Sequence, residues 1–299
     1  MLMPWFITGL IDAEGTFTWS LSRNKKVKLG WTIAPRFSIC LHIRDYTLLQ
    51  AVQQFFGGIG VLKTSGKFVY YDINSVQQLN VLFNHLSLYP LMTFKRYMYY
   101  IFLMVFDIYS KKEHLTPQGF MLCVAYINSL NKAIKPQVLS TITGSYGPLP
   151  ELVLPLIPTS ISYTLNPYWV LGFVCGEGTF TFFKRTRTNA AGITIFDYTF
   201  VFETSQLPLD TSLLMAILSM IAPGNLYSHV GSVSRIRVAN MDVLQHYVLP
   251  FFTHYPLPGY KGLQYQTWLK AVEVVIADRK YSKGREVILT RLVKDLAAL

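Results

Sequence analysis

The chain of 299 residues carries 27 Lys and Arg against 16 Asp and Glu, which gives a formal net charge of +11. This excess of cations favours a polyanionic partner, and the length is sufficient for two ordinary domains. Three scattered cysteines without a CxxC pair argue against both a disulfide framework and a thiolate zinc site.

A membrane-spanning or secreted protein is not expected, although the mean hydropathy is +0.31. The longest suspicious apolar stretch, residues 97–106, ends at Asp107, whereas a bilayer span needs roughly 20 residues. We expect this stretch to be a buried helix. No charged segment followed by an apolar one stands at the start, so we predict no secretory signal.

The first elements follow from the periodicity of the apolar residues. A helix is expected to end near residue 14, and alternation with period two then predicts strands near 16–22 and 31–42. The basic segment 23–28 forms the turn between these strands. A helix at 45–56, a hairpin at 59–73 and further helices complete this half, and residues 135–166, rich in Pro, Ser, Thr and Gly, are expected to be a linker.

The second half repeats the first. The segment PWFITGLIDAEGTF (4–17) recurs as PYWVLGFVCGEGTF (167–180), and YPLMTFK (89–95) recurs as YPLPGYK (255–261). Strands are expected at 179–187 and 194–206, a helix at 210–221 and a hairpin at 225–239. We therefore predict an α+β fold with two pseudo-symmetric αββαββα half-domains, 1–134 and 167–299, each with a four-stranded antiparallel sheet.

Small residues lie at four-residue spacing in both motif helices: Gly9 with Ala13, and Gly172 with Gly176. Residues at this spacing share a helix face, so the two helices can pack very closely between the halves. The next residues, Glu14 and Glu177, would then emerge side by side. Two carboxylates at negative helix ends favour a hard cation such as Mg²⁺. Gly15 and Gly178 suit the helix C-caps.

The segment ITGLIDAEG (7–15) resembles the LAGLIDADG motif, and VLGFVCGEG (170–178) is a looser copy. From Pro4 to about Leu292, the chain resembles the single-chain LAGLIDADG homing endonucleases encoded in fungal mitochondrial introns. The resemblance implies a monomeric, mitochondrial, Mg²⁺-dependent enzyme that makes a staggered cut in double-stranded DNA. Mn²⁺ or Ca²⁺ would substitute for Mg²⁺ in binding.

The resemblance also implies roles for individual residues. The backbone carbonyls of Ala13 and Gly176 would join Glu14 and Glu177 as metal ligands. Three further catalytic residues are implied by their matching positions: Lys95, Lys261 and Gln206. Cys175 stands where the motif has Asp, as Asp12 does in the first copy, and this departure casts doubt on a local hydrogen bond rather than on catalysis.

The polar faces of the predicted sheets supply the candidate DNA contacts. If each half covers about one helical turn, the pseudo-palindromic target has roughly 20 bp. The candidates on the strands are Ser20, Ser22, Arg36, Ser38, Lys63, Arg185, Arg187, Arg235 and Arg237. The candidates at the flanks are Arg23, Lys25, Lys26, Lys28, Lys184 and Asn189. Arginines suit guanine edges, whereas the lysine run suits phosphates.

Two other functions compete with DNA cleavage. An RNA maturase on the same fold, with the host intron RNA as partner, would help its intron splice, with or without nuclease activity. Loss of an acidic motif residue often separates that class, and the presence of both glutamates favours cleavage. A membrane-surface or structural protein has only the hydropathy in its favour.

Overall fold

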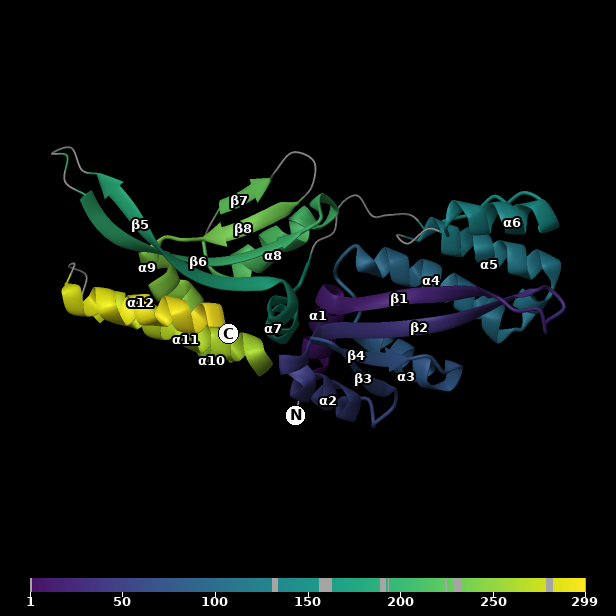
Figure 1. Cartoon of the computed structure of the whole chain (residues 1–299), viewed down its shortest axis with the longest axis horizontal. Coiled ribbons are helices and arrows are strands. Elements are labelled where there is room, and N and C mark those ends of the chain that lie inside the picture. Colours follow the sequence, from purple (N-terminus) through teal and green to yellow (C-terminus); the bar gives the residue numbers. More distant parts are fainter. Residues whose placement is uncertain are drawn as a thin grey trace. The chain divides into compact units, whose positions relative to one another are not determined.

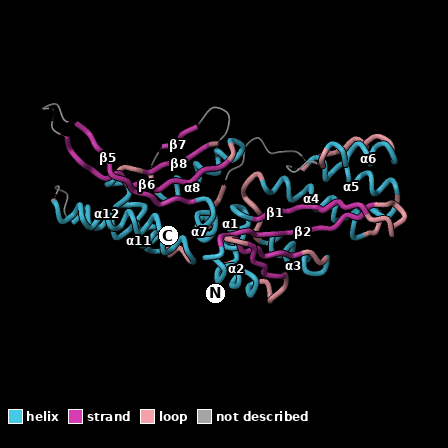
Figure 2. The backbone as a smooth tube through the Cα atoms, in the orientation of Figure 1, coloured by secondary structure: helices cyan, strands magenta, loops and turns pink. Residues whose placement is uncertain are grey.

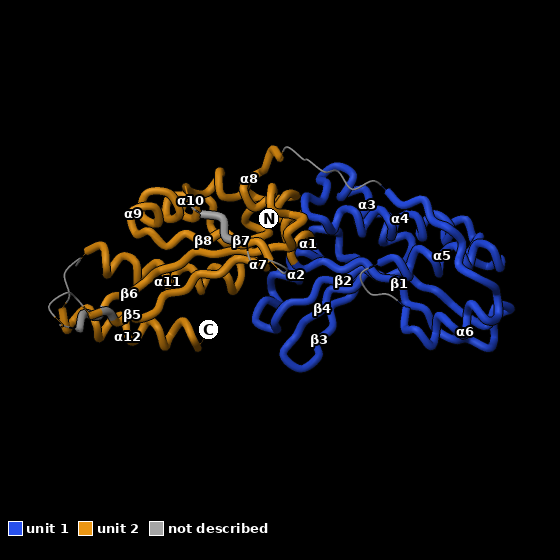
Figure 3. The backbone as a smooth tube through the Cα atoms, turned by 90° about the horizontal axis from the view of Figure 1, so that it is seen from above, with its two compact units in different colours: residues 1–2, 14–161 blue, residues 3–13, 162–299 orange. Residues whose placement is uncertain are grey.

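The computed structural model describes residues 2–130, 134–155, 163–188, 192, 194–223, 225–228, 233–277 and 282–298. Its backbone divides into two compact units, which Figure 3 shows in blue and orange. Unit 1 comprises residues 1–2 and 14–161, and unit 2 comprises residues 3–13 and 162–299. The helix α1 (Pro4–Glu14) therefore lies almost entirely in unit 2, although the strand that follows it belongs to unit 1.

Unit 1 is an antiparallel sheet with helices packed on one face (Figures 1 and 2). The strands run in the order β1-β2-β4-β3, and their bounds are β1 (Gly15–Arg23), β2 (Trp31–His42), β3 (Val61–Ser65) and β4 (Phe68–Ile73). The helices are α2 (Tyr46–Phe55), α3 (Val76–Leu88), α4 (Lys95–Ser110), α5 (Pro117–Ser129) and α6 (Pro136–Tyr146). Two short 3₁₀ turns are η1 (Ile43–Asp45) and η2 (Glu113–Leu115).

The core of unit 1 lies between its sheet and α4. Strand alternation directs Phe17 and Trp19 to the same face, where the ring centroid of Phe17 lies 4.9 Å from that of Tyr99 and that of Trp19 lies 5.0 Å from that of Phe102. Aromatic pairs at these distances each add about 0.5–1.5 kcal/mol to the stabilisation from burial alone. The apolar stretch 97–106 is thus the core helix that the sequence predicted.

Unit 2 repeats this architecture. After α7 (Pro167–Glu177), its sheet has the order β5-β6-β8-β7, with the bounds β5 (Gly178–Thr188), β6 (Thr194–Gln206), β7 (Asn225–Ser228) and β8 (Ser234–Val238). The remaining elements are η3 (Pro208–Asp210), α8 (Thr211–Ile221), α9 (Met241–Val243), a π-helical turn η4 (Leu244–Val248), α10 (Leu249–His254), α11 (Gly259–Ala277) and α12 (Lys283–Ala298).

The inner face of the second sheet packs on α10 and α11. Phe180 stacks edge-on against Phe252 at 5.2 Å between centroids and lies 5.4 Å from Trp268. The indole nitrogen of Trp268 also donates to the carbonyl of Thr181 at 2.9 Å, which fixes α11 to β5. Helices α10 and α11 therefore leave the opposite face of the sheet to its polar side chains.

The predicted fold class is confirmed, with two αββαββα arrangements and two four-stranded antiparallel sheets. The expected linker 135–166 differs from the structure, because residues 136–146 form α6. Its Tyr146 hydroxyl donates to the Leu29 carbonyl of unit 1 at 2.6 Å. Composition misled here because hydroxyls in α6, such as that of Thr141, bond to carbonyls of the same helix.

Many of the apolar residues that raise the mean hydropathy of the chain are buried in the cores of the two units. Over the part of the chain that the structure describes, no helix combines the length and the apolar character that crossing a bilayer requires.

Candidate active site and nucleic-acid interface

Helices α1 and α7 touch through glycine, within unit 2. A Cβ atom on Gly9 would lie 2.0 Å from the carbonyl oxygen of Trp169, and one on Gly172 would lie 2.0 Å from that of Phe6. No side chain fits at such distances, so only glycine lets these backbones approach. Of the four small residues expected to pack, the structure brings Gly9 and Gly172 into contact with the opposite helix; Ala13 and Gly176 lie one turn further on.

A buried carboxylate crosses the same helix pair. Asp12 is only 1% exposed, and its Oδ2 atom accepts a hydrogen bond of 2.8 Å from the indole nitrogen of Trp169. In the repeat, Cys175 corresponds to Asp12 and Phe6 corresponds to Trp169. Because Phe6 has no N–H group, a carboxylate at position 175 would lack this donor. Cys175 instead directs its thiol towards the carbonyl of Pro258 at 3.9 Å, which explains the departure from the motif.

The two candidate metal ligands end these helices. Glu14 is the last residue of α1, Glu177 is the last residue of α7, and a strand follows each directly. The C-terminal end of a helix carries partial negative charge, which adds to that of the carboxylate and favours a bound cation. Glu14 belongs to unit 1, and Glu177 belongs to unit 2.

Gly178 follows Glu177 for a different reason from the one expected. We expected the left-handed conformation that is common at helix C-caps, but Gly178 is extended, with φ −79° and ψ 148°. A Cβ atom there would lie 2.5 Å from Cγ1 and 2.7 Å from the carbonyl oxygen of Val174. Glycine is therefore required by close packing on the preceding turn, not by a positive φ.

Lys261 lies next to the end of α7. From the first turn of α11, its Nζ atom donates to the carbonyl oxygen of Gly178 at 2.6 Å, one residue beyond Glu177. Tyr265 shares this face of α11, and burial raises the pKa of its hydroxyl to about 12. That hydroxyl stays protonated at neutral pH.

The other two candidate catalytic residues lie at element ends. Lys95 opens α4 in unit 1, where its amide donates to the hydroxyl of Thr93 at 3.2 Å. Gln206 is the last residue of β6, and its Oε1 atom accepts from the amide of Leu207 at 3.1 Å. This bond stabilises the turn into η3, and the catalytic role of Gln206 stays a prediction.

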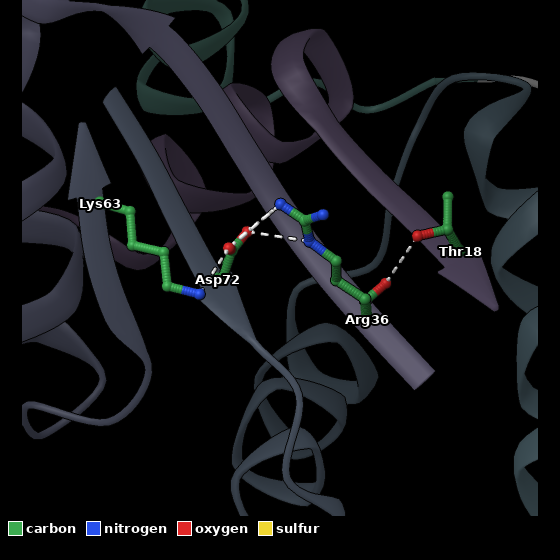
Figure 4. A network of polar contacts seen from close by, with 4 residues as sticks. All are labelled: Thr18, Arg36, Lys63 and Asp72. Atoms are coloured by element: carbon green, nitrogen blue, oxygen red, sulfur yellow. Dashed lines mark hydrogen bonds and ion pairs between the residues drawn. The ribbon is translucent and has the colours of Figure 1, made fainter. Parts of the chain in front are cut away.

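The outer face of the first sheet carries the candidates expected on its strands. Ser20 bonds to the carbonyl of Ala34 at 3.3 Å, and Ser22 bonds to Thr32 at 2.9 Å. Ser38 lies two residues beyond Arg36 on β2, and so on the same face. Arg36 and Lys63 are exposed and converge on Asp72, as Figure 4 shows.

The basic turn between β1 and β2 is exposed at each of its candidate residues. The guanidinium of Arg23 lies 5.9 Å from the ring centroid of Trp31, within cation–π range. Lys26 donates its backbone amide to Asn24 at 3.0 Å, and Lys25 and Lys28 are also exposed. These cations are available to a polyanion.

The second sheet corrects one expectation. Lys184 pairs with Glu286 of α12, on the helix-covered side, because alternation along β5 points it away from its exposed neighbour Arg185. Lys184 is therefore not among the outer-face cations. Arg235 and Arg237 do share the outer face, both beside Glu203. The Arg187 side chain and Asn189 lie outside what the structure describes.

Two acidic residues that pair with candidate DNA contacts, Asp72 and Glu203, were not predicted. Alternation alone places Asp72 on the face of Tyr70 and Glu203 on the face of Ser205. Their position on the polar face could therefore have been predicted from the sequence. Their pairing with Arg36 and Arg235 depends on the strand register, which could not be predicted from the sequence.

The donor set suits a hard cation. Among the described residues, no three His, Cys, Asp or Glu side chains gather to hold a metal ion. A metal at Glu14 or Glu177 would therefore need other oxygen donors, which backbone carbonyls, water and phosphate supply.

The fold and these motif helices define a duplicated nuclease architecture, and a family model agrees. The model for the LAGLIDADG endonuclease matches residues 7–106 and 170–272, one match in each half. The chain belongs to the LAGLIDADG endonuclease family.

Individual relatives are similar over most of the chain. The "Probable intron-encoded endonuclease 3" of Neurospora crassa is 32% identical over 91% of this chain, which spans half the length of that relative. I-SmaMI bound to its uncleaved DNA target in the presence of calcium ions is 28% identical, with a TM-score of 0.87 and 98% of each chain covered. I-SmaMI bound to cleaved DNA is 29% identical, with a TM-score of 0.85, over 98% of this chain and 96% of that one.

Proposed function

We propose that the chain is a homing endonuclease that makes a staggered, metal-dependent cut at a long pseudo-palindromic site in double-stranded DNA. The observation that carries this proposal is the glycine contact between α1 and α7, each of which ends in a glutamate. The DNA complexes of I-SmaMI support DNA as the substrate. Both motif glutamates are present, which favours cleavage over a maturase role.

Glu14 and Glu177 are the proposed side-chain metal ligands, with the carbonyls of Ala13 and Gly176 completing the protein's share. Bound Mg²⁺ would supply Lewis-acid stabilisation of the phosphate oxygens and a more acidic water. We propose Mg²⁺ as the physiological ion, with Mn²⁺ or Ca²⁺ able to support binding. The requirement for hard oxygen donors fits these residues.

The proposed catalytic side chains stabilise charge on the phosphate and orient the attacking water. The ammonium of Lys261, held at the carbonyl of Gly178, stabilises the negative charge that develops on the phosphate. Lys95 takes the same role in the first half, because it occupies the same place in the repeated YPL segment. Gln206 orients the attacking water.

The outer faces of the two sheets are the proposed DNA-binding surfaces, and one turn of duplex per half gives a target of roughly 20 bp. The chain would act as a monomer, because its two halves repeat the same sheet topology. We further propose that it is encoded in, and works in, a fungal mitochondrion, in line with the intron-encoded fungal relative.

The test is cleavage of DNA that spans the uninterrupted insertion site, with Mg²⁺ or with EDTA. Glu14→Gln and Glu177→Gln should each abolish double-strand cleavage while leaving DNA binding largely intact, because each removes a metal ligand and no groove contact. Glu151→Gln, at an exposed glutamate, is the matched control and should cleave normally. Cleavage of both strands at the normal rate by either motif variant would show that the site assignment is wrong.

A further inference from the structure

On the outer face of each sheet, one carboxylate lies between two cations from neighbouring positions. In unit 1, Asp72 accepts three hydrogen bonds from Arg36: from Nε at 3.1 Å and from Nη2 at 2.8 and 3.0 Å. Lys63 approaches the same carboxylate from β3 at 3.7 Å (Figure 4). The side chain of Asp72 is 3% exposed, whereas those of Arg36 and Lys63 are 46% and 60% exposed. The carboxylate lies beneath its cations.

Unit 2 has the same charge arrangement. Glu203 is 3.2 Å from Nη1 of Arg235 and 3.9 Å from Nη1 of Arg237. Its side chain is 21% exposed, and those of both arginines are 38% exposed. The Nε atom of Arg235 is buried and has no hydrogen-bond partner, so this guanidinium is held by the carboxylate through its outer nitrogen.

The two carboxylates occupy the same cross-strand row but different strands. Thr16 pairs with Ser38, which pairs with Asp72 on β4. In unit 2, the matching row joins Thr179 to Glu203 on β6 and then to Arg237. The acid has moved by one strand between the halves, yet in this row each half places one acid between two cations. The shared feature is therefore the charge arrangement, not a repeated residue.

Stability does not account for these acids. A buried ion pair is often no more stabilising than apolar residues of similar volume, and a carboxylate on a face that binds DNA repels phosphate. Orientation does account for them. The contacts with Asp72 use Nε and Nη2 of Arg36, so the guanidinium plane is fixed and the Nη1 edge points elsewhere. A fixed guanidinium is what a bidentate contact with a guanine edge requires.

We propose that Asp72 and Glu203 are positioning residues that determine the DNA sequence specificity of the two half-sites. Asp72 holds Arg36 and Lys63, and Glu203 holds Arg235 and Arg237, in orientations that suit base edges. Each acid also cancels one positive charge, which weakens binding to phosphates of any sequence. This inference rests on the proposed function, because it assigns a role at the proposed DNA-binding faces.

The test is selection from a duplex library with roughly 20 randomised base pairs, bound in Ca²⁺ and then sequenced. With Asp72→Asn, we expect the base preference at one or two adjacent positions of one half-site to fall at least about fivefold, the value of one bidentate contact. Glu203→Gln should do the same in the other half-site only. Binding to a scrambled duplex should strengthen in both variants, and its log–log salt slope should steepen by about 1.

Matched controls separate orientation from charge. Asp107→Asn and Glu286→Gln make the same changes at acids on helices, which pair with Lys111 and Lys184, and both variants should keep the wild-type consensus. Arg36→Lys keeps the charge but cannot make the bidentate contact with Asp72, so it should lose preference at the Asp72→Asn positions without changing the salt slope.

The outcomes are distinguishable. If Asp72→Asn and Glu203→Gln fold, bind and retain the wild-type consensus at every position, the inference is wrong and the proposed function stands. A uniform loss of preference across the whole site would also overturn it. If the wild-type chain enriches no sequence at all, the proposed function fails and the inference fails with it. Glu203→Gln tests the same inference in unit 2 if Asp72→Asn does not fold.

Discussion

The indole N–H of Trp169 satisfies the carboxylate of Asp12, which lies buried between two helices. Trp169→Phe keeps most of the ring but leaves that carboxylate without this donor. We expect the free energy of unfolding to fall by about 1–3 kcal/mol. Denaturant unfolding measures this change, and an unchanged midpoint would contradict the role of the bond.

The corresponding positions in the repeat, Cys175 and Phe6, allow a second test of this contact. Cys175→Asp should destabilise the protein, because Phe6 offers no donor to a new carboxylate. The double variant Cys175→Asp, Phe6→Trp should recover part of that loss, since it recreates the Asp12–Trp169 pair with the helices exchanged. Equal stability of the single and double variants would refute this explanation of Cys175.

Lys261 should affect chemistry rather than binding. Lys261→Met removes the ammonium that bonds to the carbonyl of Gly178, so we expect the cleavage rate to fall by about 10²–10³ with little change in DNA affinity. Single-turnover cleavage and equilibrium binding separate the two effects. Lys270→Met, at an exposed lysine of the same helix, should change neither, and equal rates for the two variants would exclude the catalytic role.

At the scale of elements, the helix pair α1–α7 depends on two glycines. Gly9→Ala or Gly172→Ala would place a Cβ atom 2.0 Å from a backbone oxygen, so the helices must separate. We expect a loss of more than about 2 kcal/mol from overpacking and a larger loss of cleavage than of binding. Gly284→Ala on α12, where a Cβ atom meets nothing within 4 Å, should be neutral or stabilise by at most about 1 kcal/mol.

Local patterns predicted most of the elements, because side-chain alternation and helix caps are properties of neighbouring residues. Alternation placed Phe17 and Trp19 on the core face, and the strand expected at 31–42 is β2 as observed. The error at Lys184 came from assigning it to a flanking loop, although the same alternation places it on the inner face.

The features that the sequence did not predict are non-local. The contact between Asp72 and Arg36 requires the β2–β4 register, which pairs residues far apart in the chain. The bond of Tyr146 to Leu29 likewise decides that α6 packs on unit 1, whereas composition suggested a linker. For the candidate site, the catalytic and metal-binding roles stay predictions. The contact of Lys261 with the carbonyl of Gly178 is also non-local, and the sequence did not predict it.

At the scale of the whole molecule, the net charge of +11 should make DNA binding strongly dependent on salt. Lysines and arginines replace condensed counterions on the duplex, so the logarithm of the affinity should fall with the logarithm of the salt concentration at a slope steeper than about −3. Titrations at several salt concentrations give this slope. A shallower value would be inconsistent with contacts along two half-sites.

The assignment of α1 to unit 2 has a consequence for how the chain can be divided. Residues 3–13 belong to the unit built from residues 162–299, although residues 14–161 form the other unit. If the backbone is cut between residues 155 and 163, the first fragment still carries the helix that the second fragment needs at Gly172. The two fragments should therefore assemble without a covalent connection when they are produced together, whereas the second fragment alone should aggregate through its uncovered α7. Cleavage activity restored only in the mixture would make this chain a natural candidate for a split, conditionally assembled nuclease.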